Sequence, residues 1–464
     1  MKFFIHILFL SVLLASCSPN KPNQKTISGK VTLENASDFS GVKVYLFALP
    51  QIDTSILNPL KKHTFLFPYD LHLFFFDFRY QKPLAQTLTD KDGNFSFSNI
   101  PDGDYILFIQ KEGFGWDYFK ISAQGKIPDL YLRKEIRVSG SLQGDNIWNS
   151  GNYIIEGDIE IPSEASLRIL PGSIIRFKGN YKLKVNGILT VESGTIFQKP
   201  VIFITDDTSY FGGGISILSN GNGRLDFVVM KNANVGVYVQ SGNLSISRSV
   251  FINNKNYGIS AVQIGLSNKV DIRNCIFVNQ PIGFNLEFTD TTTSIKNSIF
   301  VSNGESGINA ITTGARIENN FFSGNKHSIN GYSNVSGAPL KIYYNSFATS
   351  LNYHIYLRGQ DSEIKYNDIN STSGAIWLGD MYLKKTYSVL NYNNLYGKRY
   401  LLRLGSNTAN VNARYNYWGT TSESEIRNLI FDRNDVSTSD PGYGIVDYSN
   451  YLTEPIKEAG VSPR

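Results

Sequence analysis

The chain contains very little cysteine, histidine and methionine. Its 464 residues include two cysteines, five histidines and three methionines. Two cysteines form one disulfide at most, which excludes a disulfide-rich scaffold. The histidines show no His-x-His or similar spacing, so the sequence predicts no metal site. A chain of this composition must obtain its stability from a buried apolar core.

Several functional signatures are missing as well. The sequence has no Gly-x-Ser-x-Gly nucleophile motif and no phosphate-binding glycine loop. Its formal charge of +5 is spread without basic runs, so nucleic acid is not a predicted partner. The repeats described below nowhere carry an apolar 3.6-residue period over ten or more positions, which makes helices an unfavourable interpretation there.

One apolar run is present, from Phe3 to Leu14, directly after Met-Lys. It suits a signal peptide and is too short to cross a bilayer unaided. The following Leu14-Ala15-Ser16-Cys17 resembles the bacterial lipobox, in which the cysteine thiol receives diacylglycerol. The resemblance implies a signal peptide at 1–17 and lipidation of Cys17, and a plain secretory signal is the alternative. Residues 18–26 are expected to be a flexible tether.

A lipidated N-terminus predicts an exported protein anchored to a bacterial membrane. Ser18 favours sorting to the outer membrane, and the sequence leaves open whether the protein faces the periplasm or the cell surface. With Cys17 acylated, Cys275 has no partner for a disulfide. We therefore expect Cys275 to be a buried free thiol rather than a redox or metal-binding residue.

A repeated pattern dominates the rest of the chain. An apolar residue is followed three positions later by Asn, Ser or Cys, and five positions later by a large apolar residue. From residue 230 to 418 this last member recurs with spacings of 21 to 26 residues. The middle positions are Ser249, Cys275, Ser298, Asn320, Asn345, Asn367, Asn393 and Asn416.

Another apolar residue follows six to eight positions on in each repeat, ending with Ile376 and Leu401. Short β-prone runs joined by turns cannot bury their own apolar side, but copies stacked at strand spacing can. The middle column then becomes a hydrogen-bonded ladder of side chains. The pattern resembles the right-handed parallel β-helix of pectate-lyase-like proteins over residues 135–453. We predict about thirteen coils there and a tail at 454–464.

Residues 27–134 show a different sequence pattern. Thr89-Asp-Lys-Asp-Gly-Asn-Phe95 is a hairpin signal, and Pro101-Asp-Gly-Asp-Tyr105 follows. This segment resembles the carboxypeptidase regulatory-like domain, a small non-catalytic β-sandwich. The sequence thus predicts an all-β fold, with a sandwich followed by a solenoid. No cofactor is predicted; Ca²⁺ at Asp90, Asp92 and Asp104 is the alternative to turn-forming aspartates.

Residues 50–82 form an insertion in this pattern and are crowded with aromatic residues. Leu71 to Phe78 is interpreted as a strand that packs onto the sheet or onto the β-helix, and an exposed aromatic loop that touches a membrane or a partner is the alternative. The rings concerned are Phe65, Phe67, Tyr69, Phe74, Phe75, Phe76, Phe78 and Tyr80.

Acidic residues do not assemble into a convincing catalytic pair, so no catalytic residue is predicted. Asp206-Asp207 is an acidic doublet without a second carboxylate to face it. Arg273, Lys296 and Glu318 share one repeat position, which predicts an outward ion-pair column or, alternatively, a lyase base in a groove. Further acids on nearby coils, at other repeat positions, are Asp271, Glu287, Asp290 and Glu305.

Four tyrosines occupy one repeat position on consecutive coils: Tyr344, Tyr366, Tyr392 and Tyr415. They are either a ligand-stacking column for sugars or a structural stack. We expect non-catalytic binding of polysaccharide or a surface protein through the β-helix face. A polysaccharide lyase or glycoside hydrolase, and a scaffold of an envelope assembly, are the alternatives.

Overall fold

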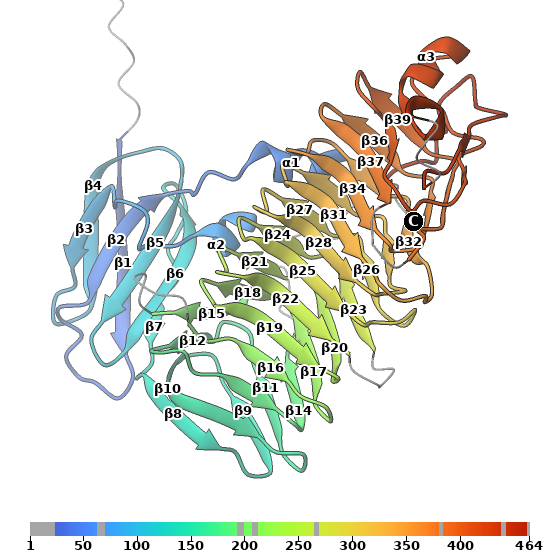
Figure 1. The fold of residues 1–464 in the computed structure, drawn as a ribbon. Coiled ribbons are helices and arrows are strands. Elements are labelled where there is room, and N and C mark those ends of the chain that lie inside the picture. Colours follow the sequence, from blue (N-terminus) through green and yellow to red (C-terminus); the bar gives the residue numbers. More distant parts are fainter. Residues whose placement is uncertain are drawn as a thin grey trace, which may run out of the picture. The chain divides into compact units, whose positions relative to one another are not determined.

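The computed structural model describes residues 24–62, 70–192, 199–206, 212–263, 269–379, 384–437 and 442–461. The fold is all-β, with about 50% strand and 5% helix, as predicted (Figure 1). The chain divides into two compact units. One unit comprises 24–49, 81–111 and 116–132; the other comprises 50–80, 112–115 and the chain from 133 onward. No described helix is long and apolar enough to cross a membrane.

The first unit is a small sandwich of two sheets. Alternating strand residues bury one side, including Val44, Leu46 and Phe108. The prediction of a hairpin at Asp90 to Gly93 is wrong, because this turn joins the strand that ends at Leu88 to the strand that begins at Asn94, and the two strands belong to different sheets. The Asp90 carboxylate stabilises the turn by accepting the backbone N–H groups of Asp92 (2.9 Å) and Asn94 (2.8 Å). The sheets are β4 (Asn94–Pro101), β1 (Gln24–Leu33) and β7 (Leu130–Leu132), and β3 (Ala85–Leu88), β2 (Lys43–Ala48), β5 (Asp104–Lys111) and β6 (Gly115–Ser122).

The second unit contains a right-handed parallel β-solenoid of about 11 turns. Each coil contributes one strand to each of three stacks, and β8 (Ile136–Ser141) pairs with the first long strand. The first stack is β10 (Asn152–Ile161), β13 (Leu183–Val185), β16 (Ile215–Ile217), β19 (Val235–Gln240), β22 (Tyr257–Val262), β25 (Ile282–Glu287), β28 (Ser306–Ile311), β31 (His327–Tyr332), β34 (Tyr353–Arg358), β37 (Gly374–Gly379), β40 (Leu402–Leu404) and β42 (Ile430–Phe431).

The second stack is β9 (Asp145–Trp148), β11 (Ser166–Ile169), β14 (Ile188–Val191), β17 (Asn222–Asp226), β20 (Asn243–Ser247), β23 (Val270–Arg273), β26 (Ser294–Lys296), β29 (Arg316–Glu318), β32 (Leu340–Tyr343), β35 (Ser362–Lys365), β38 (Ser388–Asn391), β41 (Val411–Asn412) and β43 (Val446–Asp447). The third stack is β12 (Ile174–Phe177), β15 (Val201–Thr205), β18 (Val228–Lys231), β21 (Val250–Ile252), β24 (Ile276–Val278), β27 (Ile299–Val301), β30 (Phe321–Ser323), β33 (Ser346–Phe347), β36 (Asp368–Ser371) and β39 (Asn394–Gly397).

The turn count is lower than the thirteen expected from length divided by repeat period. The chain beyond residue 419 accounts for part of the difference, because it forms α3 (Glu423–Asn428), the 3₁₀ turn η1 (Arg433–Asp435) and a long extended segment. The predicted register holds elsewhere in the repeats, with one shift at the end. Ile376 pairs with Leu402 rather than with the expected Leu401.

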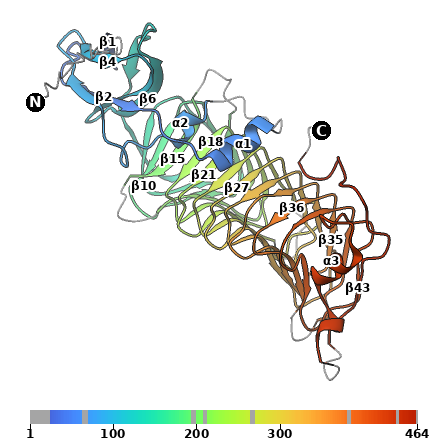
Figure 2. The same cartoon turned by 90° about the horizontal axis from the view of Figure 1, so that it is seen from above.

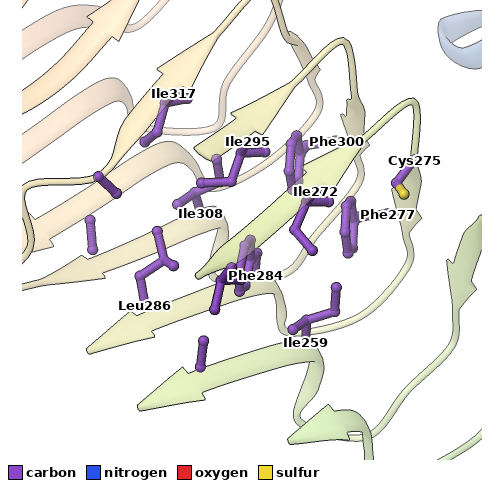
Figure 3. Close-up of a cluster of buried hydrophobic side chains, with 14 of the residues drawn as sticks. Ile259, Ile272, Cys275, Phe277, Phe284, Leu286, Ile295, Phe300, Ile308 and Ile317 are labelled. Carbon is purple, nitrogen blue, oxygen red and sulfur yellow. The ribbon is translucent and has the colours of Figure 1, made fainter. Parts of the chain in front are cut away.

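Equivalent apolar residues lie above one another in the core (Figure 3). In the third stack the rings of Phe277 and Phe300 are parallel, with centroids 4.7 Å apart. The same stacking continues to Phe322 and Phe347 at 5.0 Å per step. Each coil therefore completes the interior of its neighbour, because a single coil leaves both edges of its apolar column uncovered.

Each middle residue of the repeat lies at the short turn between the second and third stacks. All eight of these residues are fully buried. The Asn367 amide, for example, accepts the backbone N–H of Asn345 (2.9 Å) and donates to the Asn393 side chain (2.9 Å) and to the carbonyl of Ile342 (2.9 Å). These bonds supply partners to backbone groups that the tight turn leaves outside the strand ladders.

The residue before each of these positions has a left-handed backbone, which closes the turn in two residues. These positive-φ residues are Arg248, Asn274, Asn297, Asn319, Tyr344, Tyr366, Tyr392 and Tyr415. Phe227 has the same conformation one coil earlier, before Val228.

The insertion covers the outer face of the third stack. Outward side chains there are apolar and nevertheless buried, including Val250, Ile276 and Ile299. Two short helices, α1 (Thr54–Lys62) and α2 (Leu71–Phe75), lie on this flank (Figure 2). The α1 helix lies beside β27 and α2 beside β18. The Phe74 ring packs edge-on against Phe227 with centroids 5.1 Å apart.

The prediction of a strand at Leu71 to Phe78 is therefore wrong, because its first five residues form α2. Asp70 caps this helix by accepting the N–H of His72. The segment does pack onto the β-helix, as expected: Phe74 and Phe76 are buried and Tyr80 is 60% exposed. Phe65, Phe67 and Tyr69 lie outside the described residues.

A buried lysine joins the insertion to the coils. Lys231 Nζ donates to the carbonyl of Phe76, and Asp77 beside it forms a bidentate pair with Arg79. Burial lowers the pKa of Lys231 to about 8, although Asp77 opposes this shift.

The predicted tail also lies on the coils, up to residue 461. The backbone N–H of Ile456 donates to the Asn394 side chain (2.8 Å), and that of Gly460 donates to the carbonyl of Tyr366 (2.8 Å). Val461 N–H reaches Ser346 Oγ (2.9 Å). The third stack is therefore covered by the insertion on its earlier coils and by the C-terminal segment on its later coils.

Asn367→Ala should lower the free energy of unfolding by about 2–4 kcal/mol, because it removes several buried hydrogen bonds and leaves their partners unsatisfied. The midpoint of urea unfolding is the measurement. Asn334→Ala, at an exposed loop position, should leave the midpoint unchanged. Equal midpoints for the two variants would contradict a stabilising ladder.

Lys231→Met should change how stability depends on pH. The folded pKa of about 8 lies below the unfolded value of 10.5. The unfolded chain therefore binds more protons between these values, and stability rises with pH across that window. Urea titrations at pH 7 and pH 10 should show a rise larger in the wild type than in the variant, by about 3 kcal/mol. Parallel pH profiles would show that Lys231 is not shifted.

Candidate functional site

The four predicted tyrosines form a continuous stack at the turn between the second and third stacks. Ring centroids lie 4.9 Å apart for Tyr344–Tyr366, 5.3 Å for Tyr366–Tyr392 and 5.4 Å for Tyr392–Tyr415. Tyr392 and Tyr415 are 37% and 38% exposed. The left-handed backbone turns these side chains outward, whereas simple strand alternation points them inward.

The stacking limits what these rings can bind. Both faces of Tyr366 and of Tyr392 are occupied by neighbouring tyrosines, so only their edges are available to a ligand. A sugar packs on an aromatic face through its C–H groups. Within the described ranges Tyr415 has one ring partner, Tyr392, and it is the ring of this column best placed to offer a face.

The candidate acids lie in several places rather than in one cleft. Asp271 pairs with Arg273 (2.8 Å), and Glu318 pairs with Lys296 (3.1 Å) and Arg316 (2.9 Å) on the second stack. The shared position of Arg273, Lys296 and Glu318 is thus an outward column in register. These ion pairs hold the pKa of both carboxyl groups below the usual range against the opposing effect of burial.

The structure gives structural rather than catalytic roles to Asp206, from the acidic doublet, and to Cys275. Asp206 forms a bidentate pair with Arg176 (2.7 and 3.0 Å), and Asp207 lies outside the described residues. Cys275 is fully buried, and burial raises the pKa of its thiol to about 12. Cys17 and the predicted lipobox lie outside the described residues. The described residues include no group of three or more His, Cys, Asp or Glu placed to hold a metal ion.

The sequence reasoning missed an aromatic surface on the outer side of the first stack. Strand pairing brings equivalent outward residues into one column across the coils. The early members are amides joined by hydrogen bonds, such as Asn309 to Asn285 (2.7 Å) and Asn330 to Asn309 (3.0 Å). The later members are Tyr356, Trp377, Arg403 and Phe431.

We name this later part the aromatic–arginine face: Tyr332, Tyr353, Tyr356, Arg358, Trp377, Tyr400, Arg403 and Phe431. All of its residues are half-buried except Tyr400, which is 40% exposed. Tyr356 and Trp377 are stacked with centroids 4.5 Å apart, and His327 covers the Tyr356 ring at 4.9 Å. Burial lowers the pKa of His327 to about 4, so this ring is neutral at neutral pH.

Two glycines on neighbouring coils make room for these rings. A Cβ added at Gly405 would lie 2.7 Å from the Trp377 ring, and one added at Gly374 would lie 2.5 Å from the Tyr353 ring. Among the described residues Trp377 has no aromatic or cationic partner other than Tyr356. No ring of the described residues therefore covers the second face of the indole.

Two arginines of this face lie on aromatic rings. The Arg358 guanidinium is 5.7 Å from the Tyr332 centroid and 5.6 Å from that of Tyr356. The Arg403 guanidinium is 4.8 Å from the Phe431 centroid and 5.9 Å from that of Tyr400. An arginine stacked in this way keeps its N–H edge available for a second partner.

A signal for this face was present in the sequence. Ile355 and Ile376 belong to the predicted apolar column, and each is followed by an aromatic residue, Tyr356 and Trp377 respectively. Because adjacent strand residues point to opposite sides, these two residues had to face outward on consecutive coils.

A cavity of about 170 Å³ lies among the loops that follow the first stack. Its lining includes Thr289, Thr313, Gln360 and Lys384. These groups bond to one another or to the backbone: the threonine hydroxyls pair, Gln360 donates to the carbonyl of Thr313 and Lys384 pairs with Asp361. The cavity is therefore part of the packing between loops rather than a site with free donors.

Gly405→Val should displace the Trp377 side chain, because the new methyl groups would overlap its ring. The other tryptophans, at 116, 148 and 418, are buried, so we expect a red shift of the emission and stronger quenching by iodide from Trp377 alone. Gly337→Val is the matched control, since nothing lies within 4 Å of its added Cβ. Identical spectra for both variants would argue against the packing described.

Comparisons with protein families, curated proteins and solved structures find no match to this chain. No family membership therefore follows from similarity. The function has to be inferred from the chemistry of the faces described above.

Proposed function

We propose that the protein binds a polysaccharide, without cleaving it, on the aromatic–arginine face. The observation that carries this proposal is the half-buried Tyr356–Trp377 pair, in which no ring from the described part of the chain covers the second indole face. An aromatic face packs against the C–H groups of a sugar ring. The neighbouring arginine and tyrosine edges offer hydrogen-bond donors to sugar oxygens.

The parallel coils suit a linear ligand. Successive strands of the first stack lie about 4.8 Å apart, and an extended sugar residue advances a glycan chain by a similar distance. A chain that lies along the stack can therefore meet Tyr356, Trp377 and Arg403 on consecutive coils. The free end of the tyrosine column at Tyr415 is a further point of contact for a sugar.

Two observations favour binding over cleavage: the candidate acids are ion-paired, and the pKa of Tyr257, on β22 of the first stack, is raised. The candidate acids of the second stack are held in ion pairs. Burial, together with Glu287 and Glu305, raises the pKa of Tyr257, which opposes a role as a general base. We include cleavage in the test by analysing the bound polysaccharide for shortened or unsaturated products.

We further propose that lipidation of Cys17 anchors the protein to a bacterial membrane after export, with the outer membrane as the favoured site. Support for this comes from the residues of the lipobox alone. Under this proposal the solenoid presents the bound glycan beside a membrane. Labelling with a radioactive fatty acid in the expressing cell, with Cys17→Ser as the control, tests it directly.

Trp377→Ala should weaken polysaccharide binding about tenfold, or about 1.4 kcal/mol, because it removes the indole face. Affinity electrophoresis in gels that contain single polysaccharides measures the change. Tyr131→Ala, which removes an aromatic side chain that is 46% exposed on the first unit, should leave mobility unchanged. Unaltered binding of a folded Trp377→Ala protein, across all polysaccharides that retard the wild type, would refute the proposal.

A further inference from the structure

We propose that the ligand of the aromatic–arginine face is an acidic polysaccharide whose charged sugars alternate with neutral ones. Arg358 and Arg403 bind the acidic groups, and Trp377 packs against the neutral sugar between them. This inference rests on the proposed function and names the class of ligand.

The first observation is that neither arginine has an acidic partner. Among the described residues Arg358 and Arg403 form no ion pair. The Nε of Arg358 is buried and has no hydrogen-bond partner. A buried donor without a partner is costly unless a ligand supplies one. A carboxylate or sulfate satisfies a guanidinium edge with two parallel hydrogen bonds.

The second observation is the contrast with the other arginines of the solenoid. Four arginines on the second stack or at its ends pair with carboxylates of their own face: Arg248 with Asp226, Arg273 with Asp271, Arg316 with Glu318 and Arg414 with Asp447. Arg224, which is exposed on β17, is the exception. Arg358 and Arg403 thus differ from these four arginines in having no carboxylate partner among the described residues.

The third observation is the distribution of charge along the first stack. Its coils at β25 and β28 carry Glu287 and Glu305. From β31 to β40, Lys326, Lys398 and Arg399 are exposed and join the two half-buried arginines. None of these five cations forms an ion pair with a described residue. A local field of one sign attracts a polymer of the opposite sign.

The fourth observation is the order of the side chains. Arg358 lies on β34, Trp377 on β37 and Arg403 on β40. The two arginine-bearing strands are two coils apart, about 10 Å at strand spacing. Trp377 lies on the coil between these two strands, in register with Arg403, whereas Arg358 is in register with Gly379, two residues further along the strand. The indole face that Tyr356 does not cover is electron-rich and favours C–H groups over a carboxylate. Acidic groups on every second sugar fit this order better than acidic groups on every sugar.

Binding of the full-length protein to four probes tests the inference. Hyaluronan and unsulfated chondroitin carry a carboxylate on every second sugar, polygalacturonate carries one on every sugar, and dextran carries none. We expect the first two to bind most tightly, with an affinity that falls as salt rises and does not change with EDTA. Equal binding of dextran, or tighter binding of polygalacturonate, would overturn the inference.

The variant Arg358→Gln/Arg403→Gln should lose the preference for the two alternating polymers, roughly tenfold or more for each arginine. Arg273→Gln/Arg414→Gln changes the net charge by the same amount at exposed, ion-paired positions and should retain the preference. Arg358→Lys should recover only part of it, because lysine lacks the planar fork. If both double variants behave alike, the arginines do not select the ligand.

The outcome for Trp377→Ala separates this inference from the proposed function. If Trp377→Ala weakens binding while the arginine variant keeps the wild-type preference, the face binds polysaccharide but the inferred class is wrong. If neither change affects binding of any probe, both the proposed function and the inference fail.

Discussion

The two-residue turn between the second and third stacks is the constraint on which the solenoid depends. A left-handed residue bends the chain, and the buried side chain that follows it bonds to the turns above and below. This arrangement fixes the height of each coil relative to its neighbours. The apolar columns, the phenylalanine stack and both outward-facing rows of side chains inherit their alignment from it. A shift of one residue at the turn would place core residues in solvent.

The same alignment places outward side chains of successive coils in columns, and each column has a characteristic set of residue types. The second stack carries compensated ion pairs, the third stack carries apolar side chains beneath the insertion and the C-terminal segment, and the first stack changes from amides to aromatic rings and arginines. Function is therefore best sought where a column leaves charge and aromatic surface uncompensated. Only the later coils of the first stack combine both features among the described residues.

The sequence predicted the core better than the surface. Positions such as Ile317, Asn320 and Phe322 could be placed because burial imposes one residue type at a fixed period. Leu71 to Phe78 could not, since its apolar residues suit a strand as well as a short helix, and the capping by Asp70 decides between them. The aromatic–arginine face was missed because its residue types differ from coil to coil, so the sequence shows no recurring residue at these positions. The sequence likewise could not show that the rings of the tyrosine column cover one another's faces, because this depends on the ring geometry.

The left-handed turn position has a wider consequence. It accepts Phe, Arg, Asn and Tyr on different coils without disturbing the buried neighbour that follows it. Each coil thus has one position at which a single substitution changes the surface side chain and leaves the buried core residues unchanged. A protein with this architecture can gain or lose a binding side chain on one coil at a time. Selection can therefore act on its surface residues almost independently of the stability of the fold.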